Sequence, residues 1–292
     1  MMVAVGQSIM STVPWGLRWR VFLGAKLSIL DIITDVYMIH QFLISEEEGQ
    51  AKFGYMNLGM VGLSLFFQLL FVLAQNKSKG MTKVAYEVLT VVLFLKPAVD
   101  AMRVASGAEI EEGSVMDPLV ELTATKGIEM FSESIPAAIL QTFAFLKSEK
   151  KSMGALTSII ISACTTGLAS ATISYDFDTD PWKRRNNPDF YGYVPDEGGK
   201  RFLAFALMFL MSTAHIIERT LSAALLAVVD AKLLWAYLGA DMALYLSFKA
   251  VRCDFMYWVR GDNEEASEWW ERKGGGILLL FALPHSAPQP FA

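Results

Sequence analysis

Acidic side chains occur in pairs, four residues apart, inside otherwise apolar stretches of the sequence. Asp31 and Asp35 form one pair, and Glu129 and Glu133, in the stretch KGIEMFSESIPAAILQ, form another. Residues four apart share one face of an α-helix, so each pair would present two carboxylates side by side. If these apolar stretches lie in a membrane, the carboxylates inside them can bind cations, carry protons or contact polar headgroups. Since a charge at the centre of a membrane helix costs at least ~2.5–3.5 kcal/mol, they must face each other, water or headgroups.

Further ionisable residues lie in the apolar stretches, and their signs nearly balance. They are Lys26, Glu87, Lys96, Asp100, Lys126, His215, Glu218, Arg219, Asp241 and Lys249. The balance favours structural ion pairs between helices, and the alternative is a polar track along which ions, protons or headgroups move. For Lys96 and Lys249 we expect the amine to extend to the membrane surface.

The elements that carry these residues have the length of membrane spans. The chain has 292 residues, of which 53% are hydrophobic and 19% charged, and its mean hydropathy is +0.37. An α-helix needs about 20 residues to cross a ~30 Å hydrocarbon core. We therefore predict an all-α, polytopic transmembrane helical bundle of about seven spans, forming one domain over residues 1–284. The expected spans are 19–44, 53–75, 84–105, 117–146, 153–175, 202–229 and 233–251.

Segment 117–146 is longer than one crossing needs, and Pro136 near its middle lacks a backbone donor. It either crosses as a Pro-broken helix or re-enters on one side. Three further segments follow from composition: a polar loop at 176–201, an acidic and aromatic juxtamembrane segment at 252–276 and a tail at 285–292. The apolar piece GILLLFAL is too short to span, which suggests a truncated eighth span.

The charges bear on orientation and on partners. The excess of Lys and Arg around the first spans places the N-terminus in the cytosol, together with the loops 77–83 and 147–151. A net charge of -5 without a basic stripe argues against a nucleic-acid partner. Cys164 and Cys253 are far apart and the three histidines are scattered, so we expect neither a disulfide framework nor a metal site.

Catalytic signatures are also missing from the sequence. It contains no phosphate-cradling glycine loop, no HExxH and no nucleophile elbow. We expect no enzymatic activity and no cofactor.

Two fragments together resemble the XK-related membrane proteins, some of which are phospholipid scramblases. DIITDVYMIHQF (31–42) contains Asp-x-x-Thr-Asp, and EMFSESIPAAILQ (129–141) contains Glu-x-x-Pro-x-x-x-Leu-Gln. Family members have a related first motif and a later Glu-x-x-Pro-Gln-x-x-Leu-Gln, in which Ala137 here replaces the Gln. The resemblance covers about 25 residues of 292. The stretch 240–258 is similar instead to divergent multipass proteins of single-celled algae.

The resemblance implies movement of phospholipids between leaflets, with membrane lipids as partners. Together with the buried charges it selects ten candidates for a lipid or ion pathway: Asp31, Thr34, Asp35, Glu129, Glu133, Pro136, Gln141, Glu218, Arg219 and Asp241. Two alternatives stay open. An ion or proton-coupled channel or transporter would use the same charges, and a non-catalytic membrane scaffold would pair all of them internally. Self-association and a membrane partner are both compatible with the sequence.

Overall fold

The computed structural model describes residues 16–47, 49–76, 79–106, 118–149, 151–179, 181–186 and 191–252, and every regular element among them is helical. The prediction of an all-α protein is confirmed. The packing divides the chain into two units, Met1–Leu234 and Trp235–Ala292. Most of α11 (Ala231–Arg252) belongs to the second unit. The juxtamembrane segment, the tail and the suggested eighth span lie outside the described residues.

Among the described residues, four helices are long and apolar enough to cross a membrane, rather than the seven expected. They are α2 (Leu17–Ile44), α3 (Ala51–Asn76), α8 (Met153–Thr179) and α10 (Gly198–Val229). Large apolar side chains such as Phe22, Phe66 and Met211 are exposed on these helices. Polar residues such as Asp31 and Asn57 are buried between them. A water-soluble domain shows the opposite distribution, so this bundle fits a lipid environment.

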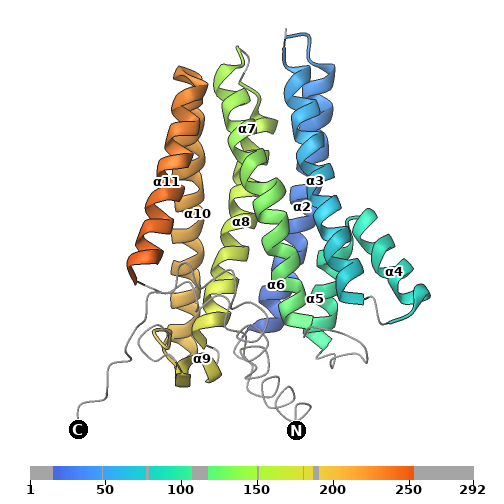
Figure 1. Ribbon diagram of the computed structural model, residues 1–292, viewed down its shortest axis with the longest axis vertical. Coiled ribbons are helices and arrows are strands. Elements are labelled where there is room, and N and C mark those ends of the chain that lie inside the picture. Colours follow the sequence, from blue (N-terminus) through green and yellow to red (C-terminus); the bar gives the residue numbers. More distant parts are fainter. Residues whose placement is uncertain are drawn as a thin grey trace, which may run out of the picture. The chain divides into compact units, whose positions relative to one another are not determined.

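Small residues allow α8 and α10 to pack closely side by side (Figure 1). Ala163, Gly167 and Ala171 recur every four residues on α8 and are all buried. A Cβ added at Gly167 would lie 2.8 Å from the Cα of Thr213 on α10. This is the small-residue spacing that lets membrane helices approach each other.

Residues 84–105 do not form the predicted third span. They lie in two short helices, α4 (Met81–Val92) and α5 (Lys96–Ser106), of 12 and 11 residues. At 1.5 Å per residue each is roughly 18 Å long, well short of a bilayer core. The chain breaks between them because Pro97 has no amide hydrogen and fits only the first turn of a new helix. Phe94, in the connection, has a φ of 58°.

The α4–α5 pair returns to the end of the bundle from which it started. α4 begins just after α3 ends, and Ala101 and Val104 of α5 pack with Val21 and Leu17 at the start of α2. Figure 1 shows both helices against the same half of α2 and α3. The segment therefore enters and leaves at one end, and the expectation of a crossing here is wrong.

The segment 117–146, by contrast, runs the whole length of the bundle (Figure 1). It forms α6 (Pro118–Glu129), a π-helical turn η1 (Met130–Ser134) and α7 (Ile135–Lys147). Leu122 packs against the cluster at the start of α2, while Ser148 donates a hydrogen bond of 3.1 Å to Glu47 beyond the end of α2. The segment is therefore a Pro-interrupted helix that runs from one end of the bundle to the other and not a hairpin that returns to the end where it began.

Pro136 accounts for the π-helical turn. In a regular helix residue 136 would donate to the Ser132 carbonyl, and proline cannot. The turn widens instead, and the Ile135 N–H bonds the Met130 carbonyl five residues earlier. π-turns of this kind are frequent at functional sites.

Because α4 and α5 return, the side assignment of the later loops changes. Ser148 lies at the end where α2 finishes, beside Glu47, and not at the end where α2 begins, which is where the loop 147–151 was expected. The opposite end holds Arg20, whose Nη2 lies 2.8 Å from Asp176 Oδ1 at the end of α8. It also holds the loop before α10, whose Val194 N–H donates to Asp178 over 2.8 Å. The short α9 (Pro181–Asn186) precedes that loop.

Candidate functional site

The two carboxylate pairs meet inside the bundle. Asp31 and Asp35 on α2 are each 4% exposed, and Glu129 and Glu133, at the end of α6 and in η1, are each 7% exposed. The Asp31 carboxyl lies within electrostatic range of the other three. We call these four residues the carboxylate cluster. The face-sharing predicted from the spacing of four is confirmed for both pairs.

One ammonium lies beside the cluster. Lys126 Nζ is 2.9 and 2.8 Å from the two carboxylate oxygens of Glu129, and it also donates to the Ser28 hydroxyl on α2. Glu133 has a side-chain hydrogen bond with Ser64 of α3. Among the described residues, four carboxyl groups therefore face one lysine, and the cluster is rich in acidic groups and in hydrogen-bond acceptors.

A chain of amide and hydroxyl groups holds the other end of the cluster. Gln141 Nε2 donates to Asp35 Oδ1 over 2.8 Å, and Ser158 Oγ donates to Gln141 Oε1 over 3.1 Å. These bonds link α2, α7 and α8, and Gln141 is 1% exposed. Asp31 differs from Asp35, since its Oδ1 is buried without a hydrogen-bond partner in the described part of the chain. Of the two aspartates, Asp35 is thus fixed by a hydrogen bond and Asp31 has unused acceptor capacity.

Not all predicted pathway residues belong to this cluster. The Thr34 hydroxyl donates a hydrogen bond of 2.9 Å to the backbone carbonyl of Asp31 in its own helix, and not to a carboxylate of the cluster. Pro136 directly follows the π-turn and shapes the backbone. Glu218 and Arg219 are exposed on α10, where Glu218 Oε2 lies 3.7 Å from His215 Nδ1. Asp241 belongs to the second unit, Trp235–Ala292.

Glu218 and Arg219 therefore lie apart from the carboxylate cluster, and their part in a pathway stays a prediction. α10 turns Thr220, Ala223 and Ala224 inward, and these small residues allow close packing. The two charged residues directly precede Thr220 and project from the exposed surface of the helix.

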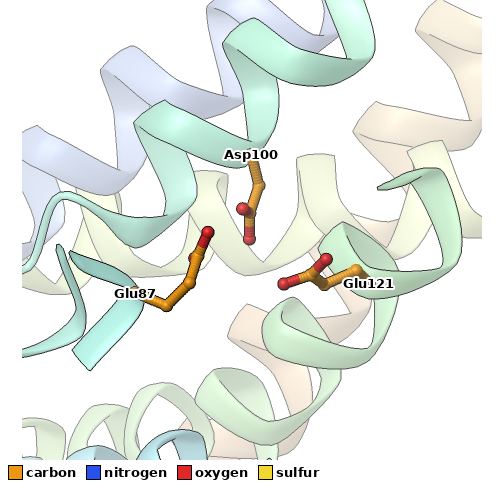
Figure 2. A group of neighbouring side chains, drawn as sticks. All are labelled: Glu87, Asp100 and Glu121. Carbon is orange, nitrogen blue, oxygen red and sulfur yellow. The ribbon is translucent and has the colours of Figure 1, made fainter. Parts of the chain in front are cut away.

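A second buried cluster was only partly predicted. Lys96 Nζ lies 2.9 Å from Glu87 Oε2, 2.7 Å from Asp100 Oδ1 and 2.5 Å from Glu121 Oε1. Figure 2 shows these three carboxylates pointing toward one another from α4, α5 and α6. Arg103 is paired with Glu87 and lies 3.4 Å from Asp100 Oδ1. We call this set the Lys96 cage.

Comparison with protein-family models, with curated proteins and with solved structures found no match to this chain. Its function is therefore argued from its own geometry.

The Lys96 cage corrects the expectation that Lys96 reaches the membrane surface, because its side chain is fully buried. Glu121 and Arg103 were not selected from the sequence. Arg103 could have been, because it lies three residues after Asp100 and seven after Lys96 and so shares their helix face. Glu121 could not, because the contact depends on how α6 packs beside α5.

The cage has the geometry of a cation site. Glu87, Asp100 and Glu121 each offer one carboxylate oxygen, and these atoms lie within 4.8 Å of one another. Lys96 already places its ammonium between them, and three N–H donors match three acceptors. The cage is thus closed by its own cation, and it joins the α4–α5 pair to α6.

Proposed function

We propose that this protein moves phospholipid headgroups between the two leaflets of a membrane, with the carboxylate cluster on their path. The observation that carries the proposal is the meeting of Asp31 and Asp35 with Glu129 and Glu133 inside a bundle whose outer surface is apolar. A zwitterionic headgroup loses its hydration in hydrocarbon, and buried polar groups replace that hydration step by step. The acyl chains would stay in the surrounding lipid.

Both signs needed for a zwitterion are present. The carboxylates suit the cationic amine of a headgroup, and Lys126 suits its phosphate. The unpartnered Oδ1 of Asp31 offers an acceptor that a passing group could use. Movement down a gradient requires neither a cofactor nor a covalent intermediate, so the proposal is of a non-enzymatic protein. A distant relationship to the XK-related proteins is part of the same proposal.

A cation or proton pathway is the second candidate. It is favoured by the ratio of four carboxylates to one lysine in the carboxylate cluster. Such an excess of buried acids is typical of proton relays and cation sites in membrane proteins.

The N-terminal end of the bundle is proposed to face the cytosol. It keeps the larger share of basic residues even after the side assignment of the later loops has changed. Among the described residues, Arg18, Lys79, Lys83, Arg184, Arg185, Lys200 and Arg201 flank the helix ends on that side (the starts of α2, α4 and α10, the end of α3, and α9), and Lys52, Lys147 and Lys151 flank those on the other (the starts of α3 and α8 and the end of α7). In membrane proteins the loops on the cytoplasmic side carry an excess of Lys and Arg, so the end with more of them is assigned to the cytosol.

The test is fluorescent-lipid scrambling in liposomes that contain the purified protein. We expect dithionite to reach inner-leaflet lipid rapidly with the wild type, and slowly with Asp35→Asn and Glu133→Gln. Glu218→Gln, which removes an exposed carboxylate of α10, is the matched control and should keep the wild-type rate.

Equal rates in all four proteins would remove the carboxylate cluster from the path. Vesicles that remain tight to lipid but show a cation flux lost in Asp35→Asn would favour the second candidate. Vesicles tight to both would favour a scaffold.

A further inference from the structure

A cavity of about 60 Å³ lies between α2, α5, α6 and α8. Its walls include Arg20, Gly24, Ser28, Ala101, Lys126 and Asp176. At roughly 10–15 Å³ for each water, it has room for a small polar group of about the size of one phosphate. It extends from the Arg20–Asp176 ion pair, at the end where α2 begins, to the Lys126 ammonium beside the carboxylate cluster.

Arg20 has hydrogen-bond donors that its own surroundings do not use. Its side chain is fully buried, and Nη2 lies 2.8 Å from Asp176 Oδ1. Nε and Nη1 have no hydrogen-bond partner among the described residues. Buried donors are normally paired, so an arginine in this state at a cavity wall indicates a missing acceptor.

Aromatic rings hold the guanidinium of Arg20 in place. Its Cζ lies 4.4 Å from the centre of the Tyr175 ring and 5.4 Å from that of Phe205. These contacts limit the rotation of the guanidinium, whose Nε and Nη1 are themselves buried. Lys126 is a second cation on the same wall; its ammonium already donates to Ser28 and to both carboxylate oxygens of Glu129, so a phosphate would replace one of these acceptors.

The rest of the wall is largely apolar. Val21, Leu122 and Leu168 line it together with small residues of α5 and α8. Two cations with an apolar surround suit a phosphodiester attached to a hydrophobic molecule, since arginine and lysine are the usual partners of phosphate. Asp176 keeps 16% of its side chain exposed and could face the positive part of a zwitterionic headgroup.

We propose that this cavity binds a phosphate group, supplied by a phospholipid headgroup or by free phosphate, through the unused donors of Arg20 and the Lys126 ammonium. The inference rests on the proposed function for its role, in which the cavity would be the entrance to the carboxylate cluster. The binding itself can be measured without any transport.

The experiment is native mass spectrometry of the purified protein in detergent with one probe at a time. The probes are dioleoylphosphatidylcholine, dioleoylglycerol, which lacks the phosphate, and inorganic phosphate. We expect one phosphatidylcholine to be retained at least fivefold more than dioleoylglycerol.

Two variants test the location. Gly24 lines the cavity, and a Cβ there meets nothing within 4 Å. Gly24→Leu therefore adds volume at the cavity wall without a clash and without changing any charge. Gly59→Leu on α3 is the matched control, because its Cβ also meets nothing within 4 Å and it lies outside the cavity wall. We expect Gly24→Leu to reduce retention at least fivefold and Gly59→Leu to leave it unchanged. Arg20→Lys keeps the charge opposite Asp176, removes the unused donors and should also weaken retention.

Each outcome decides a separate point. Retention of inorganic phosphate but not of lipid, lost in Gly24→Leu, would make free phosphate the ligand. Equal retention of both lipids, or no effect of either Gly24→Leu or Arg20→Lys, would overturn the proposal. Retention with the expected pattern in a protein that does not scramble lipid would keep the site and reject the proposed function. Scrambling without retention would reject the phosphate site and keep the proposed function.

Discussion

Replacing Lys96 by Met tests whether the Lys96 cage holds the α4–α5 pair in place. The substitution keeps much of the side-chain volume and removes the ammonium that contacts Glu87, Asp100 and Glu121 at 2.5–2.9 Å. In the wild type three carboxylates face two cations, Lys96 and Arg103, a net charge of minus one. In the variant the three carboxylates face one cation, Arg103, which gives a net charge of minus two.

Removing one partner of a buried ion pair costs about 3–5 kcal/mol, because the other charge stays buried without compensation. Since all three carboxylates lose the ammonium, and Arg103 pairs only with Glu87 and Asp100, Glu121 is left without an ion pair in the described part of the chain, and we expect a value near 5 kcal/mol. At ~2–4 °C per kcal/mol for a chain of this size, the melting temperature in detergent should fall by about 10–20 °C. Intrinsic fluorescence during a thermal ramp measures it.

Two further variants make this test specific. Lys96→Met/Glu121→Gln returns the cage to two carboxylates and one cation, so we expect it to recover about half of the loss. Lys200→Met is the matched control, since Lys200 Nζ lies 3.0 Å from Glu197 in a pair whose side chains are largely exposed. It should cost no more than about 1 kcal/mol. Equal melting temperatures for Lys96→Met and Lys200→Met would refute a buried cage.

Three other predictions concern the remainder of the bundle. Gly167→Val should destabilise the protein by about 1–3 kcal/mol or more in the same thermal assay, because its Cβ would meet the backbone of Thr213 at 2.8 Å. Asp178→Ala should speed amide exchange in the loop before α10 at least tenfold, since hydrogen bonds to a charged group contribute about 1.5–3 kcal/mol each. Hydrogen bonding from Arg201 and the nearby positive charge of Arg184 lower the pKa of Asp196 below its ordinary value of 3.8. A lowered pKa in the folded state stabilises the loop above pH 3.8 and ceases to do so as the pH falls through the lower value, so NMR titration should find Asp196 ionised at pH 4.

Control variants are available for the first two of these. Gly62→Val adds the same side chain where a Cβ meets nothing within 4 Å, so it should be nearly neutral. Glu197→Ala removes an exposed carboxylate near the same loop and should leave amide exchange unchanged. Equal effects of Gly167→Val and Gly62→Val would contradict close helix packing, and a pKa of Asp196 above 3.8 would contradict its pairing with the two arginines.

The long helices and the shared face of each acid pair could be predicted, because both depend on local sequence. Hydropathy over about 20 residues identifies α2, α3, α8 and α10, and the spacing of four fixes which face Asp31 and Asp35 occupy. The meeting of this face with Glu129 and Glu133 was suggested by the resemblance to XK-related proteins. The function of these residues stays a prediction.

The false third span shows where hydropathy fails. Residues 84–105 are apolar enough for a crossing, but the direction of the chain changes at the Lys96–Pro97 interruption. The composition of a segment does not indicate that the chain turns back. Nothing in the sequence around Phe94 predicted its φ of 58°. Glu121 was missed for a related reason, since its contact with Lys96 depends on the packing of separate helices.

The π-helical turn at Met130–Ser134 sets the angular phase between the two halves of one crossing. Restoring regular α-helical geometry without changing the length of the chain would rotate each position of α7 by about 100° relative to α6, and Gln141 would leave Asp35. Deleting one residue from the turn as well would return α7 to its present phase, because a π-helical turn holds one residue more than the α-helical turn it replaces. During evolution the loss of one residue together with the π-helical turn would therefore keep Gln141 opposite Asp35, whereas a change of hydrogen bonding at constant length would not.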